Sequence, residues 1–175
     1  MKTGDLSSAV GHRVAELRKD RGLSLSALAA AAGIGKGSLS ELEAGDRNPT
    51  LATLYALAGQ LEVPLASLLG DEIGTSLVAG GLTHHLIDVR RTETATRETY
   101  RVEGEADAER HSPAHGPGVT EHLLVTEGSI RAGTVGAEAQ AGPGQTLTWV
   151  SDREHFYQVV EAPFAAVLVI VTPVS

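Results

Sequence analysis

The spacing of apolar residues changes abruptly near residue 72, and this change constrains the architecture more than any other feature. In residues 1–72, Leu and Ala recur every three or four positions, which is the period of an amphipathic helix. In residues 82–175, Val and Thr alternate with polar residues between Gly and Pro turns, which is typical of half-buried strands. We therefore predict two domains, the first all-α and the second all-β. Residues 73–81, rich in Gly and short side chains, are interpreted as a linker.

Composition excludes several classes of protein. The chain has 175 residues, is 42% hydrophobic and contains no Cys, so it is long enough for two small globular domains but has no disulfide, thiolate zinc site or cysteine nucleophile. Its longest apolar run, residues 164–171, is far shorter than the roughly 20 residues of a membrane helix. Residues 1–5 lack the apolar core of a signal peptide, so we expect a cytoplasmic protein without membrane association. An aromatic content of 3% disfavours base stacking on single-stranded nucleic acid.

Five short helices are expected in residues 1–72. Apolar residues at helical spacing mark the first helix, and Gly22 provides a left-handed cap at its end. Ser24 is a good N-cap for the second helix. Leu39 and Leu42 are expected to be buried by the third helix. The second to fifth helices are predicted at 24–32, 35–44, near 50–61 and 64–69.

Short strands separated by Gly and Pro turns are expected in residues 82–175. A hairpin is indicated at the Glu127–Gly128 turn. Many short strands with such frequent turns favour a sandwich or a small barrel. The strands are predicted near 82–90, 97–103, 120–127, 129–135, 145–150, 155–161 and 164–172.

The second and third helices carry a recognisable motif. Ala29 is small where two helices must approach closely, and a short turn at Gly33 joins them. The stretch from Leu23 to Thr50 resembles the Xre-type (phage-repressor-like) helix-turn-helix family, and the resemblance covers about residues 10–69. It implies a five-helix domain whose third helix enters the major groove of double-stranded DNA.

In that family, the exposed start of the third helix contacts bases. Lys36 could donate to guanine and Glu41 could accept from cytosine, and each such contact gives about 1–3 kcal/mol of discrimination. Gly37 can contribute only its backbone. The alternative for Lys36 and Ser38 is a solvated helix surface, and a carboxylate at Glu41 is repelled by phosphates unless it meets a cytosine. The resemblance places nine residues at the DNA: Ser24, Gly35, Lys36, Gly37, Ser38, Ser40, Glu41, Arg47 and Asn48.

Two further positions match a structural feature of the family. Arg18 and Glu43 occupy the positions of an ion pair that joins the first helix to the end of the third. The resemblance implies that this pair fixes the orientation of the recognition helix. Arg47 and Asn48, in the loop after the third helix, are expected to contact phosphates.

Charge argues that one copy of the chain binds DNA weakly. Residues 1–50 contain seven Lys and Arg and six Asp and Glu, a net charge of +1, so few phosphates are neutralised. Useful affinity then needs a homodimer that reads two half-sites of a palindromic operator. Residues 73–175 contain seven basic and 13 acidic residues and are not a DNA surface. We expect them to provide the dimer contact.

Three potential metal ligands occur in the all-β half: His115, Glu121 and His155. Imidazole and carboxylate groups on neighbouring inward positions could hold a divalent metal ion. Their spacing resembles the cupin family, because Glu121 is followed seven residues later by Gly128, as in the first cupin motif. His115 matches a histidine of that motif, and His155 matches the histidine of the second. The resemblance covers about residues 82–172 and implies a double-stranded β-helix, a small barrel.

The chain departs from the cupin pattern at two positions. Pro117 stands where the family has a second histidine, and Val159 stands where it has an asparagine. Three ligands completed by water would still suffice for one divalent metal ion. Without a metal, the same side chains would hydrogen-bond each other or a ligand. His122 is next to Glu121 on a strand, so it is expected on the opposite face.

A pocket for a small-molecule effector is predicted inside the barrel. Barrels of this size hold at most one small ligand, and the same positions are also plausible as plain core. Arg110 and Arg153 near the mouth could attract an anionic effector, although a solvated surface arginine is the simpler interpretation. The expected pocket residues are Tyr100, Leu123, Val125, Leu147, Trp149 and Tyr157.

These features together favour a one-component transcriptional regulator without enzymatic activity. The first domain would bind the operator, and the second would dimerise and sense the effector. One alternative is a cupin metalloenzyme, such as a dioxygenase or isomerase, with a DNA-tethering head. The other is an antitoxin-like module whose β domain binds another protein.

Overall fold

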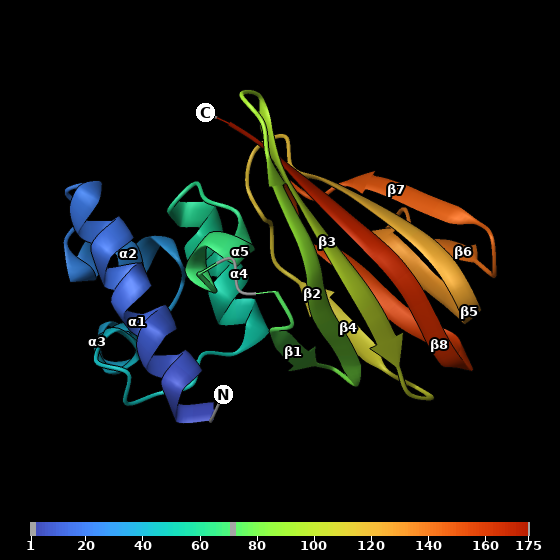
Figure 1. Ribbon diagram of the computed structural model, residues 1–175, viewed down its shortest axis with the longest axis horizontal. Coiled ribbons are helices and arrows are strands. Elements are labelled where there is room, and N and C mark those ends of the chain that lie inside the picture. Colours follow the sequence, from blue (N-terminus) through green and yellow to red (C-terminus); the bar gives the residue numbers. More distant parts are fainter. Residues whose placement is uncertain (1–2, 71–72, 175) are drawn as a thin grey trace. The chain divides into compact units, whose positions relative to one another are not determined.

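The computed structural model describes residues 3–70 and 73–174, with side chains from residue 8 onward. The chain forms two compact units, residues 1–72 and 73–175 (Figure 1). The first unit is all helix and the second all strand, as the two apolar periods predict. Among the described residues, no helix is long and apolar enough to cross a membrane.

Five helices form the described part of the first unit, and side-chain caps fix where two of them begin. Ser24 Oγ accepts a hydrogen bond from Ala27 N at 3.1 Å, and Thr50 Oγ1 accepts one from Thr53 N at 3.1 Å. Gly33 turns the chain between two helices with a φ of 66°. The helices are α1 (Thr3–Asp20), α2 (Leu25–Ala31), α3 (Lys36–Glu43), α4 (Leu51–Gln60) and α5 (Leu65–Leu68).

Apolar residues at helical spacing form the core of this unit. Val14, Leu28 and Leu39 are fully buried. Helices α1 and α3 approach each other closely at Gly11, because a Cβ atom there would collide with the carbonyl oxygen of Leu42. Helix α3 is thus in direct backbone contact with α1.

Within residues 73–174, eight strands form an antiparallel sheet. The strands are β1 (Ser76–Ala79), β2 (Leu82–Arg91), β3 (Ala95–Gly104), β4 (Glu109–Ser112), β5 (Thr120–Thr134), β6 (Ala139–Ala141), β7 (Thr146–Val150) and β8 (His155–Pro173).

Strands β5 and β8 are long enough to run through two halves of the sheet. Residues 120–124 of β5 pair with β7, and residues 120–125 pair with residues 166–171 of β8, which in turn pairs with β3. Residues 129–134 of β5 pair with residues 155–161 of β8, whose other neighbour is β4. The sheet therefore folds over itself at the bends of β5 and β8 (Figure 1).

Two turns predicted from the sequence are bends within strands. The register of β5 against β8 shifts between Val125 and Ile130. At the bend, Gly128 has a φ of 67°, and a Cβ atom there would collide with the carbonyl oxygens of Glu161 and Pro163. Glycine is required here because the two bends pack backbone against backbone. The segments predicted at 120–127 and 129–135 consequently form one strand.

Residues 73–81 differ from the expected linker. Residues 76–79 form strand β1, which pairs with residues 82–85 of β2, so most of this stretch belongs to the sheet. Its Gly and Ser content reflects the tight turn at Gly80 and Gly81, which have φ values of 58° and 76°, and an edge strand with little to bury. Composition alone does not distinguish such a hairpin from a linker.

Candidate functional site

Helix α3 presents a polar face outward. Lys36, Gly37, Ser40 and Glu41 are exposed, whereas Leu39 and Leu42 are buried at 0% and 2% exposure against the rest of the unit. This division follows from the helical period, which puts the two leucines three residues apart on one face. The short turn after α2 leaves the N-terminal part of α3 accessible, which is the part that enters a major groove in helix-turn-helix proteins.

The structure pairs Arg18 with Glu43. Arg18 Nε and Nη2 donate to the two carboxylate oxygens of Glu43, each at 2.7 Å, and Arg18 Nη1 donates to the carbonyl oxygen of Leu23 at 2.9 Å. The side chains of Arg18 and Glu43 are only 12% and 11% exposed. The hydrogen bond from Arg18 to Glu43 raises the pKa of the guanidinium further, so the pair stays ionised. It joins the end of α1 to the end of α3.

The remaining predicted DNA contacts lie around the same helix. Arg47 Nη1 donates to Ser38 Oγ at 3.2 Å and to Glu41 Oε2 at 3.3 Å, so Glu41 already has a cationic neighbour. A hollow of about 210 Å³ lies beside the start of α3 and is lined in part by Gly35, Ser38, Arg47 and Asn48. Ser24 and Gly35 are exposed N-caps of α2 and α3.

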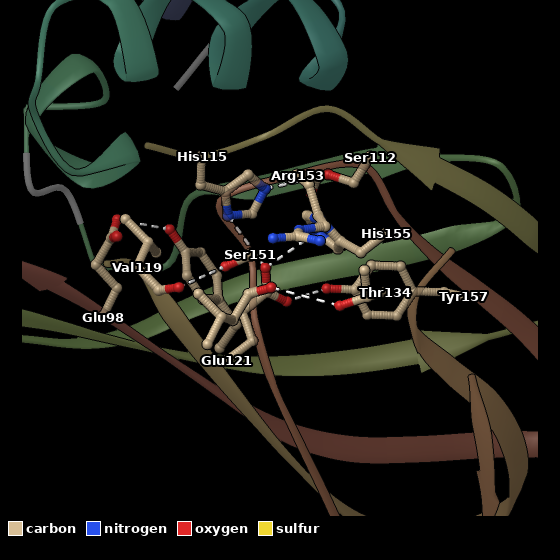
Figure 2. Close-up of polar contacts among 12 residues, drawn as sticks. Glu98, Ser112, His115, Val119, Glu121, Thr134, Ser151, Arg153, His155 and Tyr157 are labelled. Carbon is tan, nitrogen blue, oxygen red and sulfur yellow. Dashed lines mark hydrogen bonds and ion pairs between the residues drawn. The ribbon is translucent and has the colours of Figure 1, made fainter. Parts of the chain in front are cut away.

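In the β unit, the fold brings His115, Glu121 and His155 together. Glu121 lies in the first half of β5, His155 begins β8, and His115 lies in the loop between β4 and β5. The loop is fixed because His115 N donates to the carbonyl oxygen of Ser151 at 2.8 Å. His115 Nδ1 and His155 Nε2 lie 3.1 and 3.0 Å from Glu121 Oε1. The three side chains are drawn in Figure 2. All three residues are buried, and each offers one ligand atom within 4.8 Å of the others.

The hydrogen bonds of His155 show that this cluster fits a cation. His155 Nδ1 lies 3.1 Å from the carbonyl oxygen of Arg153, which can only accept, so Nδ1 carries the proton. In a neutral ring, the lone pair on Nε2 then faces Glu121 Oε1, another acceptor. Both atoms are buried, and their contact does not meet hydrogen-bond geometry among the described residues. Two buried acceptors at this distance are unfavourable unless a cation or a proton lies between them. The donor set, two imidazoles and one carboxylate, suits a divalent metal ion.

The carboxylate of Glu121 is held from both sides. Tyr157 donates a short hydrogen bond to Glu121 Oε2, which leaves Oε1 directed at the two histidines. Burial by itself would raise the pKa of Glu121, but the neighbouring His115 and His155 lower the pKa well below its usual range. Burial lowers the pKa of His115, against the opposing effect of Glu121. The cluster therefore contains an anionic carboxylate at neutral pH.

Arg110 is not the surface residue that the simpler sequence interpretation suggested. It lies on β4, which was not predicted as a strand, and its side chain points inward with 5% exposure. Arg110 Nη2 donates to Ser112 Oγ at 2.8 Å, and Ser112 Oγ lies 3.1 Å from His115 Nε2. The arginine is thus one hydrogen-bonded residue away from the candidate metal ligands. Arg153, by contrast, is exposed and pairs with Asp152 at 3.1 Å.

The residues predicted to line an effector pocket lie in the interior of the β unit. Tyr100, Leu123, Val125, Trp149 and Tyr157 are buried, and Leu147 is half-buried. Trp149 and Tyr157 have their ring centres 5.6 Å apart, and the Trp149 and His155 centres are 6.1 Å apart, so these aromatic rings border the His and Glu cluster.

The outer face of the sheet differs from this interior. His122 lies there, half-buried beside Thr148, whose Oγ1 is 3.1 Å from His122 Nδ1. A shallow hollow of about 500 Å³ includes His122, Val169 and Val171 together with Asp88, Arg90, Arg97 and Thr99. His122 is therefore directed away from Glu121, as strand alternation requires.

Among the described residues, two buried ionisable side chains were not singled out in the sequence. His84 is 1% exposed and Glu98 is 1% exposed, and Tyr100 donates to Glu98 Oε1 at 2.9 Å. A signal for both was present, because His84 stands between Leu82 and Leu86 at strand period and Glu98 stands two residues before Tyr100. An inward period-two position occupied by a polar residue in this way indicates a buried polar group.

Comparison with known proteins gives consistent results. The sequence pattern of the HTH_3 family, described as helix-turn-helix, matches residues 14–68. The HTH-type transcriptional regulator SutR of Escherichia coli K12 is 27% identical over 147 residues, covering 82% of this chain and 83% of that protein. The uncharacterized HTH-type transcriptional regulator y4dJ of Sinorhizobium fredii is 42% identical over 65 residues, covering 37% of this chain and 84% of that protein.

A solved structure extends the similarity to almost the whole chain. The crystal structure of an HTH_3 family transcriptional regulator from Vibrio cholerae matches with a TM-score of 0.86 and 26% identity. The match covers 97% of both chains, so it includes the β unit as well as the helices.

Proposed function

The chain belongs to the Xre-type HTH_3 family of helix-turn-helix transcriptional regulators and carries a cupin-like β domain C-terminal to its DNA-binding domain, and on this premise we propose that it is a one-component regulator. The helical domain reads an operator in double-stranded DNA. The β domain dimerises and binds a small-molecule effector, and the protein acts in the cytoplasm. An effector that prefers one arrangement of the dimer changes operator affinity by its differential affinity for that arrangement.

One observation carries the DNA-reading part of this proposal. Helix α3 exposes Lys36 and Ser40 on one face. On its other face Leu39 and Leu42 are buried in the core, and Glu43 pairs with Arg18 of α1. A helix that contacts base edges must be accessible on one face and rigid on the other. The nine proposed DNA contacts all lie on or beside this exposed face or at the N-cap of α2.

Selection of duplex DNA from a random library by the full-length chain tests the proposal. We expect enrichment of a palindrome whose half-sites are about one helical turn apart, because a symmetric dimer presents two copies of α3. Enrichment of no sequence above the starting library would contradict the proposal.

The dimer contact is proposed on the outer face of the β domain. Leu124 pairs with Val167 across β5 and β8, and Leu124 is 40% exposed. Val150 is 46% exposed on the neighbouring strand β7. Exposed apolar groups that share one sheet face support an association surface.

Sedimentation of the full-length chain tests the dimer. The wild type is expected to sediment as a dimer at micromolar concentration, and Leu124→Lys combined with Val167→Lys should shift it toward the monomer. Val160, 48% exposed in the other half of β8, provides the matched control Val160→Lys. A monomeric wild type, or a double variant that dimerises as well as the control, would contradict this assignment.

A divalent metal ion in the His115, Glu121 and His155 cluster is the proposed cofactor. The two buried acceptors, His155 Nε2 and Glu121 Oε1, support it. Elemental analysis of the full-length protein should find about one divalent ion per chain, lost in His155→Ala but retained in His122→Ala, whose side chain lies on the outer face. Equal metal content in both variants would remove the cluster from consideration as the metal site.

A second candidate function is a cupin metalloenzyme of the dioxygenase or isomerase type. The same cluster favours it, since three protein ligands leave positions for substrate on a metal ion. A bound metal would act there as a Lewis acid or redox centre, and Tyr157 would hold the Glu121 carboxylate in place. The similar proteins described above are transcriptional regulators, so we place regulation first. Turnover of a substrate that depends on His155 would reverse that order.

A further inference from the structure

A group of buried N–H donors lies beside the candidate metal cluster. The guanidinium of Arg110 is its centre: Nη1 lies 3.1 Å from His84 Nε2, and Nη2 donates to Ser112 Oγ at 2.8 Å. The Cζ atom of Arg110 is 5.4 Å from the centre of the Tyr157 ring. Because arginine stays protonated, this places a fixed positive charge and several donors in the interior of the β domain.

His84 adds a second donor. The guanidinium of Arg110 can only donate, so His84 Nε2 accepts. Burial, followed by the charge of Arg110, lowers the pKa of His84 to about 3, so the ring is neutral and its single proton is on Nδ1. This Nδ1–H is buried and has no hydrogen-bond acceptor among the described residues. Such orphaned donors are rare in folded proteins, and a ligand that carries an acceptor would satisfy this one.

Trp149 supplies the third donor. Its Nε1–H can only donate, and it too is buried without an acceptor in the described part of the chain. The ring centre of Trp149 is 5.6 Å from that of Tyr157, which is the ring beneath Arg110. The three donor side chains therefore form one cluster linked through the Tyr157 ring, which reaches from β2 across β4 and β8 to β7.

We propose that this cluster binds a small organic carboxylate, and that such a compound is the effector. The inference rests on the proposed effector-binding role of the β domain. A carboxylate brings one negative charge and two acceptor oxygens, which can accept from Arg110 and from the orphaned donors of His84 and Trp149. A neutral ligand of the same size would bring no negative charge, so its hydrogen bonds to these donors would be weaker than the charge-assisted bond between a carboxylate and a guanidinium.

The surroundings favour an organic body over an inorganic anion. Leu123, Leu168 and Ile170 lie in the same interior with at most 1% exposure, and the rings of Tyr157 and Trp149 lie there too. Inorganic phosphate or sulfate has no apolar surface to place against these groups, whereas an aliphatic or aromatic acid has. The apolar part of the ligand is thus assigned to these side chains and its carboxylate to the donors.

The position of Ser112 connects this ligand to the metal cluster. Ser112 Oγ accepts from Arg110 and lies 3.1 Å from His115 Nε2. A carboxylate that draws the guanidinium toward itself alters the hydrogen bond on Ser112 and, through it, the orientation of His115.

Fluorescence titration of the full-length chain tests the proposal, because Trp149 is the only tryptophan. The probes are butyrate and benzoate, with butyramide and benzamide as uncharged controls of matched shape and inorganic phosphate as the anion control. The acids are expected to change Trp149 fluorescence saturably, whereas the amides and phosphate have little effect. Equal binding of the amides, or binding of phosphate alone, would overturn the assignment.

Variants identify the anchoring residue. Arg110→Gln should weaken binding of the acids at least about tenfold, because a charge-assisted hydrogen bond is lost. Arg131→Gln is the matched control, since Arg131 is exposed and lies 5.3 Å above the ring of Phe156 in the same domain. It should change binding less than about twofold. Unchanged affinity in Arg110→Gln contradicts the proposal.

Two further measurements keep the test decisive. If Arg110→Gln does not fold, Trp149→Phe replaces the indole with an aromatic ring that has no N–H, and calorimetry should show about fivefold weaker binding of the acids. Unaltered binding in that variant would contradict the role of Trp149 Nε1. DNA binding by the same preparation is measured in parallel. If selected DNA is bound but no acid is, the carboxylate inference fails while the regulator proposal stands.

Discussion

The two domains place their polar groups in opposite ways. In the helical domain, the core consists of residues such as Val14, Leu28 and Leu57, and the groups proposed to act lie on the exposed face of α3. In the β domain, Arg110, Glu121 and His155 lie inside with at most 5% exposure. The first arrangement suits a partner as large as DNA, which approaches a preformed surface. The second admits only an ion or a small molecule.

The two arrangements also differ in energetic cost. An exposed polar group exchanges one set of water contacts for another, whereas a buried group without a partner costs about 1–3 kcal/mol. The β domain therefore carries a cost that a ligand can relieve. In the helical domain, the low-exposure pair of Arg18 and Glu43 resembles the β interior, and both members satisfy each other.

Removing one member of that pair should have the largest effect on stability. Glu43→Ala leaves Arg18 with little exposure and without its carboxylate, so we expect a loss of about 3 kcal/mol in the free energy of unfolding of the helical domain. Glu16→Ala is the control, because Glu16 is 64% exposed in its pair with Arg13 and should change stability by less than about 0.5 kcal/mol. Urea unfolding followed by circular dichroism measures both. Equal effects would remove the contrast between the two pairs.

Acid should destabilise the β domain through His84. The pKa of His84 is about 3 in the folded state against the ordinary 6.5, so the unfolded chain takes up this proton first as the pH falls. The contribution of His84 to the free energy of unfolding is therefore present above about pH 6.5 and is lost as the pH falls toward about 3. About 2 kcal/mol of it is lost between about pH 7 and 5. His115, whose pKa is also lowered by burial, contributes with the same sign.

A substitution separates the contribution of His84 from the others. His84→Gln removes the titrating ring, so its free energy of unfolding should depend less steeply on pH in urea titrations from neutral pH to about pH 5. His12→Gln changes an exposed histidine on α1 and should retain the wild-type slope. A His84→Gln variant with the wild-type slope would show that His84 is not the residue responsible.

The substitution Lys36→Ala tests whether α3 reads bases. On the selected operator we expect a loss of about 1–3 kcal/mol, confined to one base pair in each half-site, because a side chain that contacts one base edge discriminates at that position only. Lys19→Ala, at the exposed end of α1, is the control. Competition with operator variants measures the profile. A uniform loss at every position would reassign Lys36 to the phosphate backbone.

Arg47→Ala should have the smallest effect on DNA binding, and this effect should not depend on the base sequence. The Arg47 guanidinium lies beside Ser38 and Glu41 in the loop after α3, where phosphate contact is proposed. Arg47→Ala is expected to weaken binding to all duplexes about equally and to reduce the slope of log affinity against log salt by about one for each half-site. A changed base preference with an unchanged salt slope would indicate that Arg47 reads a base.

The helical domain could be predicted almost residue by residue, because its rules are local. Ser24 and Gly33 mark an N-cap and a left-handed turn, and the predicted third helix at 35–44 differs from the observed α3 only by its two capping residues. The partnership of Arg18 with Glu43 came from the family resemblance, since nothing in their spacing brings residues 25 positions apart together.

The β domain was predictable in class but not in detail. Gly128 and Pro163 were interpreted as turns that separate two strands, but the long strands β5 and β8 bend there and continue. Strand β4 is short and polar, so the sequence does not predict toward which side of the sheet the Arg110 side chain points. The burial of Arg110 depends on the pairing of β4 with β8. Long-range pairing of this kind decides which polar residues are enclosed, and local patterns do not contain it.

The affinity of the full-length chain for its selected duplex, compared with a scrambled duplex of equal length and composition near physiological salt, tests the central claim most directly. Base reading by α3 predicts a preference of about a thousandfold or more. Equal affinity for both duplexes at every salt concentration would contradict it.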